Sequence, residues 1–191
     1  MQLPVLLYDN QILQEKAKAV DATYPGLQKL IADMWETMYG ANGCGLAAPQ
    51  VNVPIQVFVV DSKNTFKQMK PEERKEYFAG DTGIQETFIN ARITEKSGET
   101  WVDQEGCLSL PAVWAIVERP WRITIEYLDA RFKPREKTFS GLTARMIQHE
   151  FDHTQGILYI DHLPPLKRIS LTHKLKRIMA GKVKPNYPVK Y

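Results

Sequence analysis

The chain has 191 residues, of which 43% are hydrophobic and 10% aromatic, so it is long enough for one domain with a buried core and is not disordered throughout. No apolar run approaches the ~20 residues that cross a bilayer, and the N-terminal segment lacks the pattern of a secretory signal. Two cysteines, Cys44 and Cys107, are too few for a disulfide framework, and we expect both to be reduced in a cytoplasmic protein with no membrane partner. The net charge of +3 is unevenly spread, because residues 166–191 hold eight of the 25 basic residues and none of the 22 acidic ones.

Apolar residues at three- and four-residue spacing predict an amphipathic helix from Leu27 to Met38, and a buried strand follows over Ile55–Val60. Residues 62–83 are charged and show no clear period, so we predict an irregular surface insertion there. Further strands are predicted over Phe88–Thr94, Trp101–Val102, Val113–Val117 and Arg122–Tyr127, and a last one ends near Phe139.

Two helices are predicted toward the C-terminal end. The first runs from Leu142 to about Thr154, with Ser140 as its N-cap and Gly156 at its close. A basic amphipathic helix then spans about residues 166–180, and the residues from Lys184 onward are expected to fray. Helices on both sides of mostly antiparallel strands predict an α+β fold. We divide the chain into a metallohydrolase domain over residues 1–165 and a basic C-terminal helix and tail over residues 166–191.

The strongest chemical signal is the segment that begins at His149 and ends at His153. On a helix, positions i and i+4 share a face, so both imidazoles can reach one metal ion. Glu150 lies next to the first histidine and can act as a general base on a water beside the metal. The plainer interpretation, a solvated helix face with incidental histidines, is disfavoured because the chain has only four histidines.

The third ligand decides the class of site. The spacing of one group of zinc peptidases would place a third histidine at Tyr159, and no glutamate follows His153 to serve another group. Asp161 and His162 stay open as third ligands of a zinc endopeptidase. Cys107 is the better candidate, because one thiolate and two imidazoles leave an open coordination position for water.

Three segments together resemble the peptide deformylase family, in the order that the family has them. The segment Gly43–Gln50 is similar to its Gly-x-Gly-x-Ala-Ala-x-Gln motif, Glu105–Ser109 to its Glu-Gly-Cys-x-Ser motif, and Gln148–His153 to its Gln-His-Glu and Asp-His motif. The resemblance covers most of the chain. It implies an active-site helix packed among small antiparallel sheets and one divalent metal held by Cys107, His149 and His153. It also implies Fe²⁺ in the cell, with Ni²⁺, Co²⁺ or Zn²⁺ as substitutes, whereas ligand chemistry alone favours Zn²⁺.

The resemblance implies a reaction as well. The metal lowers the pKa of a water, Glu150 accepts its proton, and the formyl group of an N-terminal formyl-methionine is released as formate. The Gln50 side chain and the Leu108 backbone N–H are similar to the family's donors to the formyl oxygen. Gly45 is expected to hydrogen-bond the peptide backbone. Leu46, Leu108 and Ile147 are expected to flank the methionine pocket, and Gln148 and Asp152 to support the ligands.

Some features depart from the family or lie outside the chemistry. Trp114 stands where a basic residue is often found, which affects how residues after the methionine are contacted.

Residues 166–191 are expected to dock on ribosomal RNA, as the family implies, although a solvated end is the alternative. Where the core still folds without the segment from Leu166 onward, we also expect the cleavage of short formyl peptides to be spared. A metal-stabilised binding module is the alternative without catalysis.

Overall fold

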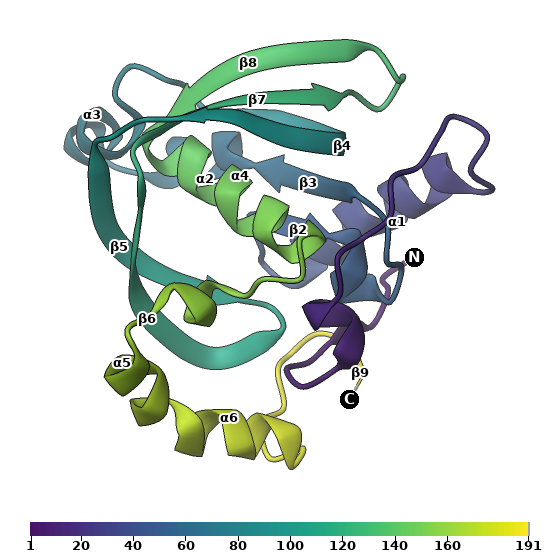
Figure 1. The fold of residues 1–191 in the computed structure, drawn as a ribbon, viewed down its shortest axis with the longest axis vertical. Helices are drawn as coiled ribbons and strands as arrows, with labels where there is room; N and C mark the ends of the chain where they lie inside the picture. The colour runs from purple at the N-terminus through teal and green to yellow at the C-terminus, as the bar shows by residue number, and fades with distance from the viewer. Residues whose placement is uncertain (191) are drawn as a thin grey trace.

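The computed structural model describes residues 1–190 as a mixture of strands and helices (Figure 1). The strands are β1 (Val5–Leu6), β2 (Gly45–Ala47), β3 (Val57–Asp61), β4 (Gln85–Lys96), β5 (Thr100–Cys107), β6 (Leu110–Pro120), β7 (Arg122–Leu128), β8 (Pro134–Ser140) and β9 (Val189–Lys190). The α-helices are α1 (Leu27–Gly40), α2 (Ser62–Gln68), α3 (Pro71–Phe78), α4 (Gly141–Thr154), α5 (Pro165–Ser170) and α6 (Thr172–Met179). Short 3-10 helices cover Gln11–Gln14, Ala48–Val51 and Tyr159–His162. Among these helices, none is long and apolar enough to cross a bilayer.

The strands form three small sheets. Strands β2, β3, β4, β7 and β8 form an antiparallel sheet in that order, β5 and β6 form a long curved hairpin, and β1 pairs with β9 in parallel. Helix α4 lies between the five-stranded sheet and the hairpin (Figure 1). The predicted α+β class and the predicted helix among small antiparallel sheets are therefore confirmed.

Sequence patterns explain the two elements that frame the site. In β7, alternate residues Ile123, Ile125 and Tyr127 are buried, as expected for a strand with one face on the core. Helix α4 is buried on nearly every face, and two of its polar side chains, those of Arg145 and Gln148, donate to backbone carbonyls of the hairpin. The Arg145 guanidinium donates to the Val117 carbonyl at 3.0 Å, and hydrogen bonds of this kind fix the helix against the hairpin.

The start of α4 differs from the prediction in one detail. Ser140 occupies the N-cap position, as predicted, but its side chain makes no capping hydrogen bond. The first helical residue is Gly141, whose φ of +56° lies in the left-handed region. A Cβ at this position would collide with the Tyr77 carbonyl, so the close approach of α3 explains the glycine.

The prediction of an irregular segment over residues 62–83 was wrong, because the segment contains α2 and α3. Asp61 caps α2 by accepting from the Asn64 N–H, and Pro71 begins α3 at the position where its missing N–H costs nothing. Phe78 is fully buried at the end of α3. The charged residues of the segment lie on solvated helix faces. Their number outweighed, in the sequence prediction, the helix-start residues Asp61 and Pro71 and the buried Phe78.

The C-terminal end also differs from the prediction. The expected single basic helix is two helices, α5 and α6, which meet at Leu171. Leu171, Leu175 and Ile178 are buried against the same core as the N-terminal segment. The prediction of fraying from Lys184 onward was wrong, because the chain continues in an extended conformation to β9.

Candidate metal centre

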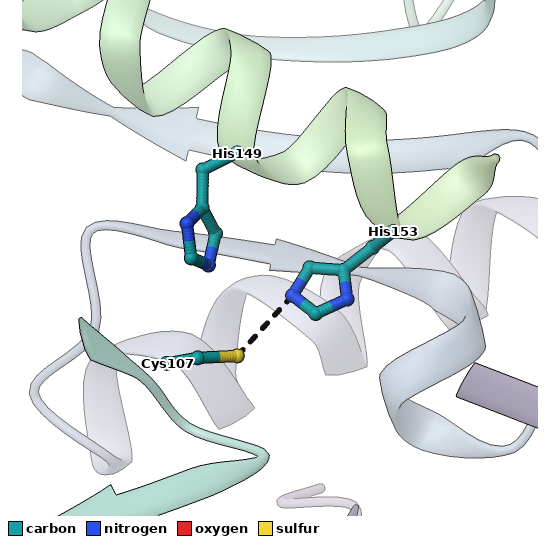
Figure 2. A group of neighbouring side chains, drawn as sticks. All are labelled: Cys107, His149 and His153. Atoms are coloured by element: carbon teal, nitrogen blue, oxygen red, sulfur yellow. Dashed lines mark hydrogen bonds between the residues drawn. The ribbon is translucent and has the colours of Figure 1, made fainter. Parts of the chain in front are cut away.

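Helix α4 and the end of β5 bring three potential ligands together. His149 and His153 lie one helical turn apart and both point toward Cys107 (Figure 2), with ring centroids 5.2 Å apart. The Cys107 Sγ lies 3.2 Å from the His153 Nε2, and one ligand atom from each of the three residues lies within 4.8 Å of the others. We call these residues the Cys-His-His group; their donor atoms are close enough to hold one metal ion.

A buried ionic network orients His149. Its Nδ1 lies 2.9 Å from the Glu105 Oε2, which leaves Nε2 for the side of Cys107. Glu105 in turn accepts from Arg119 at 2.6 and 3.0 Å and from Arg145 at 2.6 Å. Although burial opposes it, hydrogen bonds from His149 and Arg119 hold the pKa of Glu105 well below its usual range. The carboxylate is therefore charged, and it fixes both the tautomer and the direction of the imidazole.

The same network accounts for the acidic residue beside the second histidine. Asp152 accepts from Arg119 at 2.8 Å and lies 2.7 Å from the His162 Nε2. Asp161 forms an ion pair with Arg168 at 2.7 Å. Asp161 and His162, the alternative third ligands of an endopeptidase, are thus engaged elsewhere. Within residues 1–190, the Cys-His-His group is the one cluster of His, Cys, Asp and Glu compact enough for a metal.

The thiol in the group is set up to ionise. Burial alone would raise the pKa of Cys107, but the neighbouring His153 and His149 imidazoles lower it to about 5. The thiolate and Glu105 together raise the pKa of His149 against the effect of burial. A soft thiolate beside two imidazoles is a donor set that suits first-row transition metals.

Glu150 lies in the same place and has an unsatisfied oxygen. The side chain is 5% exposed, and its Oε2 has no hydrogen-bond partner. Burial raises the pKa of Glu150 to about 7. A Cβ added to Gly45 would lie 2.6 Å from the Glu150 Cγ and 2.7 Å from its Cδ, so only glycine fits beside this carboxyl group. A buried carboxyl with one free oxygen is suited to accept a proton from a molecule in the site.

Gln50 and the turn after Cys107 place further donors beside the group. The Gln50 Oε1 accepts from the Ala47 N–H at 2.8 Å, which orients the amide so that its Nε2 faces the thiol. That Nε2 donates to the Ser109 Oγ at 3.2 Å and lies 3.4 Å from the Cys107 Sγ. Because Cys107 pairs with Leu110, Leu108 and Ser109 form the turn between β5 and β6.

A cleft of about 540 Å³ opens over these groups. Its walls include Gly45, Gln50, Glu105, Cys107, Leu108, His149 and Glu150. Trp114, which is 58% exposed, also lines the cleft, where its ring packs across Gly106. A second hollow of about 610 Å³ lies around Trp35, Tyr39 and Arg135, apart from the Cys-His-His group.

Two predicted pocket residues lie behind the cleft. Leu46 and Ile147 have no exposed surface and belong to the core clusters on either side of β2. They are not among the residues that line the cleft, so their contact with a methionine side chain stays a prediction.

The sequence interpretation missed several wall residues. Leu110, Val113 and Met146 line the cleft, and so do Val183, Pro185 and Tyr187 of the C-terminal tail. The tail carries a readable signal, since its apolar residues alternate with polar or proline residues as in a strand. No local signal marks Met146 as a wall residue rather than a core residue of α4.

Known proteins match this chain along its whole length. The family model for polypeptide deformylase matches residues 2–169. Peptide deformylases of Christiangramia forsetii and Flavobacterium johnsoniae are each 42% identical, over all of this chain and 96% of their own. The crystal structure of a peptide deformylase from Legionella pneumophila has a TM-score of 0.78 and 35% identity, and covers 95% of this chain and 98% of its own. That from Ehrlichia chaffeensis has a TM-score of 0.81 and 29% identity, with coverage of 95% and 99%.

The matches agree with the geometry of the site. A cysteine, two histidines and a buried glutamate lie together, three of these four residues line one cleft, and the matched fold surrounds them. The chain therefore belongs to the polypeptide deformylase family and is a metal-dependent hydrolase that removes the formyl group from the N-terminal formyl-methionine of new proteins.

Proposed function

We propose that Cys107, His149 and His153 hold one divalent metal ion and that Glu150 is the general base of deformylation. The observation that carries the proposal is the placement of Glu150, a buried carboxyl with a free Oε2, in the cleft that the three potential ligands line or border. The residues fit a metal because the thiol favours its ionised form and His149 is oriented from behind by Glu105.

For the ion, we propose Fe²⁺, with Ni²⁺, Co²⁺ or Zn²⁺ as substitutes. The donor set favours transition metals over Mg²⁺ or Ca²⁺, and the family resemblance favours iron among them. Purification without oxygen, followed by elemental analysis, tests the assignment. About one iron per chain is expected. Purified protein that contains zinc and no iron would overturn the choice of ion.

When bound, the metal would make a water molecule more acidic and polarise the formyl carbonyl. The Glu150 carboxylate accepts the proton of the attacking water and then passes it to the nitrogen of the leaving amine. The Gln50 Nε2 and the Leu108 N–H donate to the formyl oxygen as negative charge develops on it. Formate and a free N-terminal methionine leave the site.

The cleft accounts for the substrate in outline. We propose that the Gly45 backbone hydrogen-bonds the peptide, because the absence of a side chain keeps the cleft open beside Glu150. Apolar walls around Leu108 favour a methionine side chain over a polar one. Leu46 and Ile147 shape this region from behind, as core residues in contact with the walls.

Formate release from formyl-Met-Ala-Ser tests the proposed base. Glu150→Gln should keep its metal and lose turnover by ~10²–10⁴-fold, because an amide cannot accept the proton. Glu136→Gln on the exposed face of β8 is the matched control and should behave as the parent chain. Turnover of Glu150→Gln within a few-fold of the parent at neutral pH would remove Glu150 from this role. A metal-loaded parent that releases no formate would favour the metal-stabilised binding module.

We further propose that the basic C-terminal segment docks on the ribosome, in the cytoplasm. In this proposal residues 1–165 carry the chemistry and residues 166–191 carry the contact, although the two share a core. Lys174, Lys176 and Arg177 are exposed on α6, while Leu175 and Ile178 are buried and pack the helix against the core. An exposed cationic face of this kind is suited to the phosphates of RNA.

Charge reversal is the appropriate test of docking. Deletion from Leu166 is unsuitable, and the expectation that the segment is dispensable for short peptides is not supported, because the segment covers the core and lines the cleft. Lys174→Glu, Lys176→Glu and Arg177→Glu together should abolish ribosome co-sedimentation and spare formate release. Lys63→Glu, Lys67→Glu and Lys75→Glu make the same charge change near α2 and α3 and should bind as the parent does, less tightly as salt rises. Equal binding by both triple variants would leave the segment as a solvated end.

A further inference from the structure

The last described residues form an extended strap over the body. We call residues 181–190 the strap; they run from the end of α6 back to the N-terminal segment (Figure 1). Its odd-numbered residues are half-buried, while the even-numbered residues are exposed. Its end is fastened by backbone hydrogen bonds, from the Val5 N–H to the Pro188 carbonyl at 2.9 Å and from the Leu7 N–H to the Lys190 carbonyl at 3.0 Å.

The strap contacts the turn that follows Cys107. The Tyr187 hydroxyl donates to the Leu108 carbonyl at 2.8 Å. From the other chain end, the Tyr8 N–H donates to the Ser109 carbonyl at 2.8 Å. Because β1 and β9 pair with each other, both carbonyls of the turn are held by one unit made from the two ends of the chain.

This turn carries the groups on which the proposed chemistry depends. It begins at Cys107, presents the Leu108 N–H, and contacts the Gln50 amide through the Ser109 hydroxyl. The central peptide plane of a two-residue turn has alternative orientations, and a hydrogen bond to its carbonyl stabilises one of them. Burial raises the pKa of the Tyr187 phenol, so the hydroxyl stays a donor throughout the working pH range.

The strap is also part of the cleft wall. Lys184, Pro185 and Tyr187 line the cleft together with Leu110 and Trp114. Residues far apart in the sequence thus enclose the space above the Cys-His-His group. We propose that the strap completes the active site, with Tyr187 as the positioning residue that holds the turn of Cys107 and Leu108 and as a wall of the peptide cleft. The inference rests on the proposed function, because it gives the turn its catalytic meaning.

The variant Tyr187→Phe removes the hydroxyl and keeps the ring, so it tests the hydrogen bond apart from the wall. Tyr39→Phe is the matched control. Tyr39 also loses a hydroxyl that is hydrogen-bonded to two side chains, but it lies in the hollow apart from the Cys-His-His group. Tyr187→Phe should lower kcat for formyl-Met-Ala-Ser by about 3- to 10-fold, the effect of one lost hydrogen bond, and leave KM unchanged. In the Co²⁺-loaded protein it should also shift the thiolate and ligand-field absorption bands. Tyr39→Phe should change neither.

Tyr187→Ala removes the wall as well, so KM should rise in addition to the loss of kcat. A Tyr187→Phe variant with the kcat and the Co²⁺ spectrum of the parent would overturn the positioning role, and an unchanged KM in Tyr187→Ala would overturn the wall. Failure of the proposed function looks different, since the parent itself would then release no formate. In that case the Co²⁺ spectrum alone still decides whether Tyr187 holds the turn.

Discussion

Replacement of Gly45 by alanine should disable the site without touching a ligand. Gly45 does not have a positive φ, so its backbone accepts alanine without strain. The new Cβ would lie 2.6 Å from the Glu150 Cγ and 2.7 Å from its Cδ, about 1 Å closer than the 3.5–4.0 Å of ordinary carbon contacts. Glu150 sits on a helix buried on nearly every face, so the carboxyl group must move rather than the backbone.

A displacement of about 1 Å in a reacting group costs roughly 10²-fold in rate. We therefore expect Gly45→Ala to lower kcat by ~10²-fold, while overpacking lowers the free energy of unfolding by about 1–3 kcal/mol. Metal content should not change. Gly98→Ala is the matched control, since a Cβ there meets nothing within 4 Å, and its turnover should equal that of the parent.

The assay is formate release by the two single variants and by the double variant with Glu150→Gln. If alanine acts by displacing the base, it should cost little more once the base is gone, because residues that act as a unit are not additive. An equal further loss in the Glu150→Gln background would show that alanine blocks the peptide instead. Gly45→Ala turnover within a few-fold of the parent would refute the close packing of base and glycine.

Three further predictions follow from the buried charges and the thiolate. Arg119→Met should lower the free energy of unfolding by about 3–5 kcal/mol in urea titrations, because it removes the guanidinium that pairs with two buried carboxylates, leaving Glu105 with Arg145 and His149 and Asp152 with His162 alone. Arg92→Met, at an exposed ion pair, should cost about 1 kcal/mol or less. Burial raises the pKa of Glu150 to about 7, and a bound cation would lower it. The value of kcat/KM should therefore fall as the pH decreases, with a midpoint between about 4.5 and 7. A midpoint above pH 7 would contradict the role of Glu150 as the base. Peroxide should inactivate the Fe²⁺ form faster than the Ni²⁺ form, and equal rates would exclude oxidation at the metal.

Strong periodicity and short-range spacing made the central part of the fold predictable. The helix around Leu27 and the strand at Ile123 were predicted from local periodicity, because each buries one regular face. The helix around His149 is buried on nearly every face, and its bounds were predicted from Ser140 and Gly156 at its two ends. The spacing of the two histidines on a helix predicts a shared metal from geometry alone. Cys107 lies 42 residues before His149 and no local pattern joins them, so ligand chemistry made it the better candidate and the family resemblance supported it, while Asp161 and His162 stayed open.

Long-range contacts were beyond a local interpretation of the sequence. Arg119 and Arg145 orient Glu105 from two other elements, and nothing in their own segments shows it. Tyr187 reaches Leu108 across 79 positions, and the strap gains its stability from β1 at the opposite end of the chain. In residues 62–83, charge composition outweighed the start signals of α2 and α3 in our prediction, although those signals were present.

Metal content and formate release, measured on the same samples, test the central claim most directly. The account predicts about one metal per chain in the parent and one formate for each new amine from formyl-Met-Ala-Ser. Cys107→Ser should lose both, because a serine alkoxide forms far less readily than a thiolate, whereas Cys44→Ser should keep its metal since Cys44 lies outside the Cys-His-His group. A Cys107→Ser variant with a full complement of iron and the turnover of the parent would contradict the proposed metal centre.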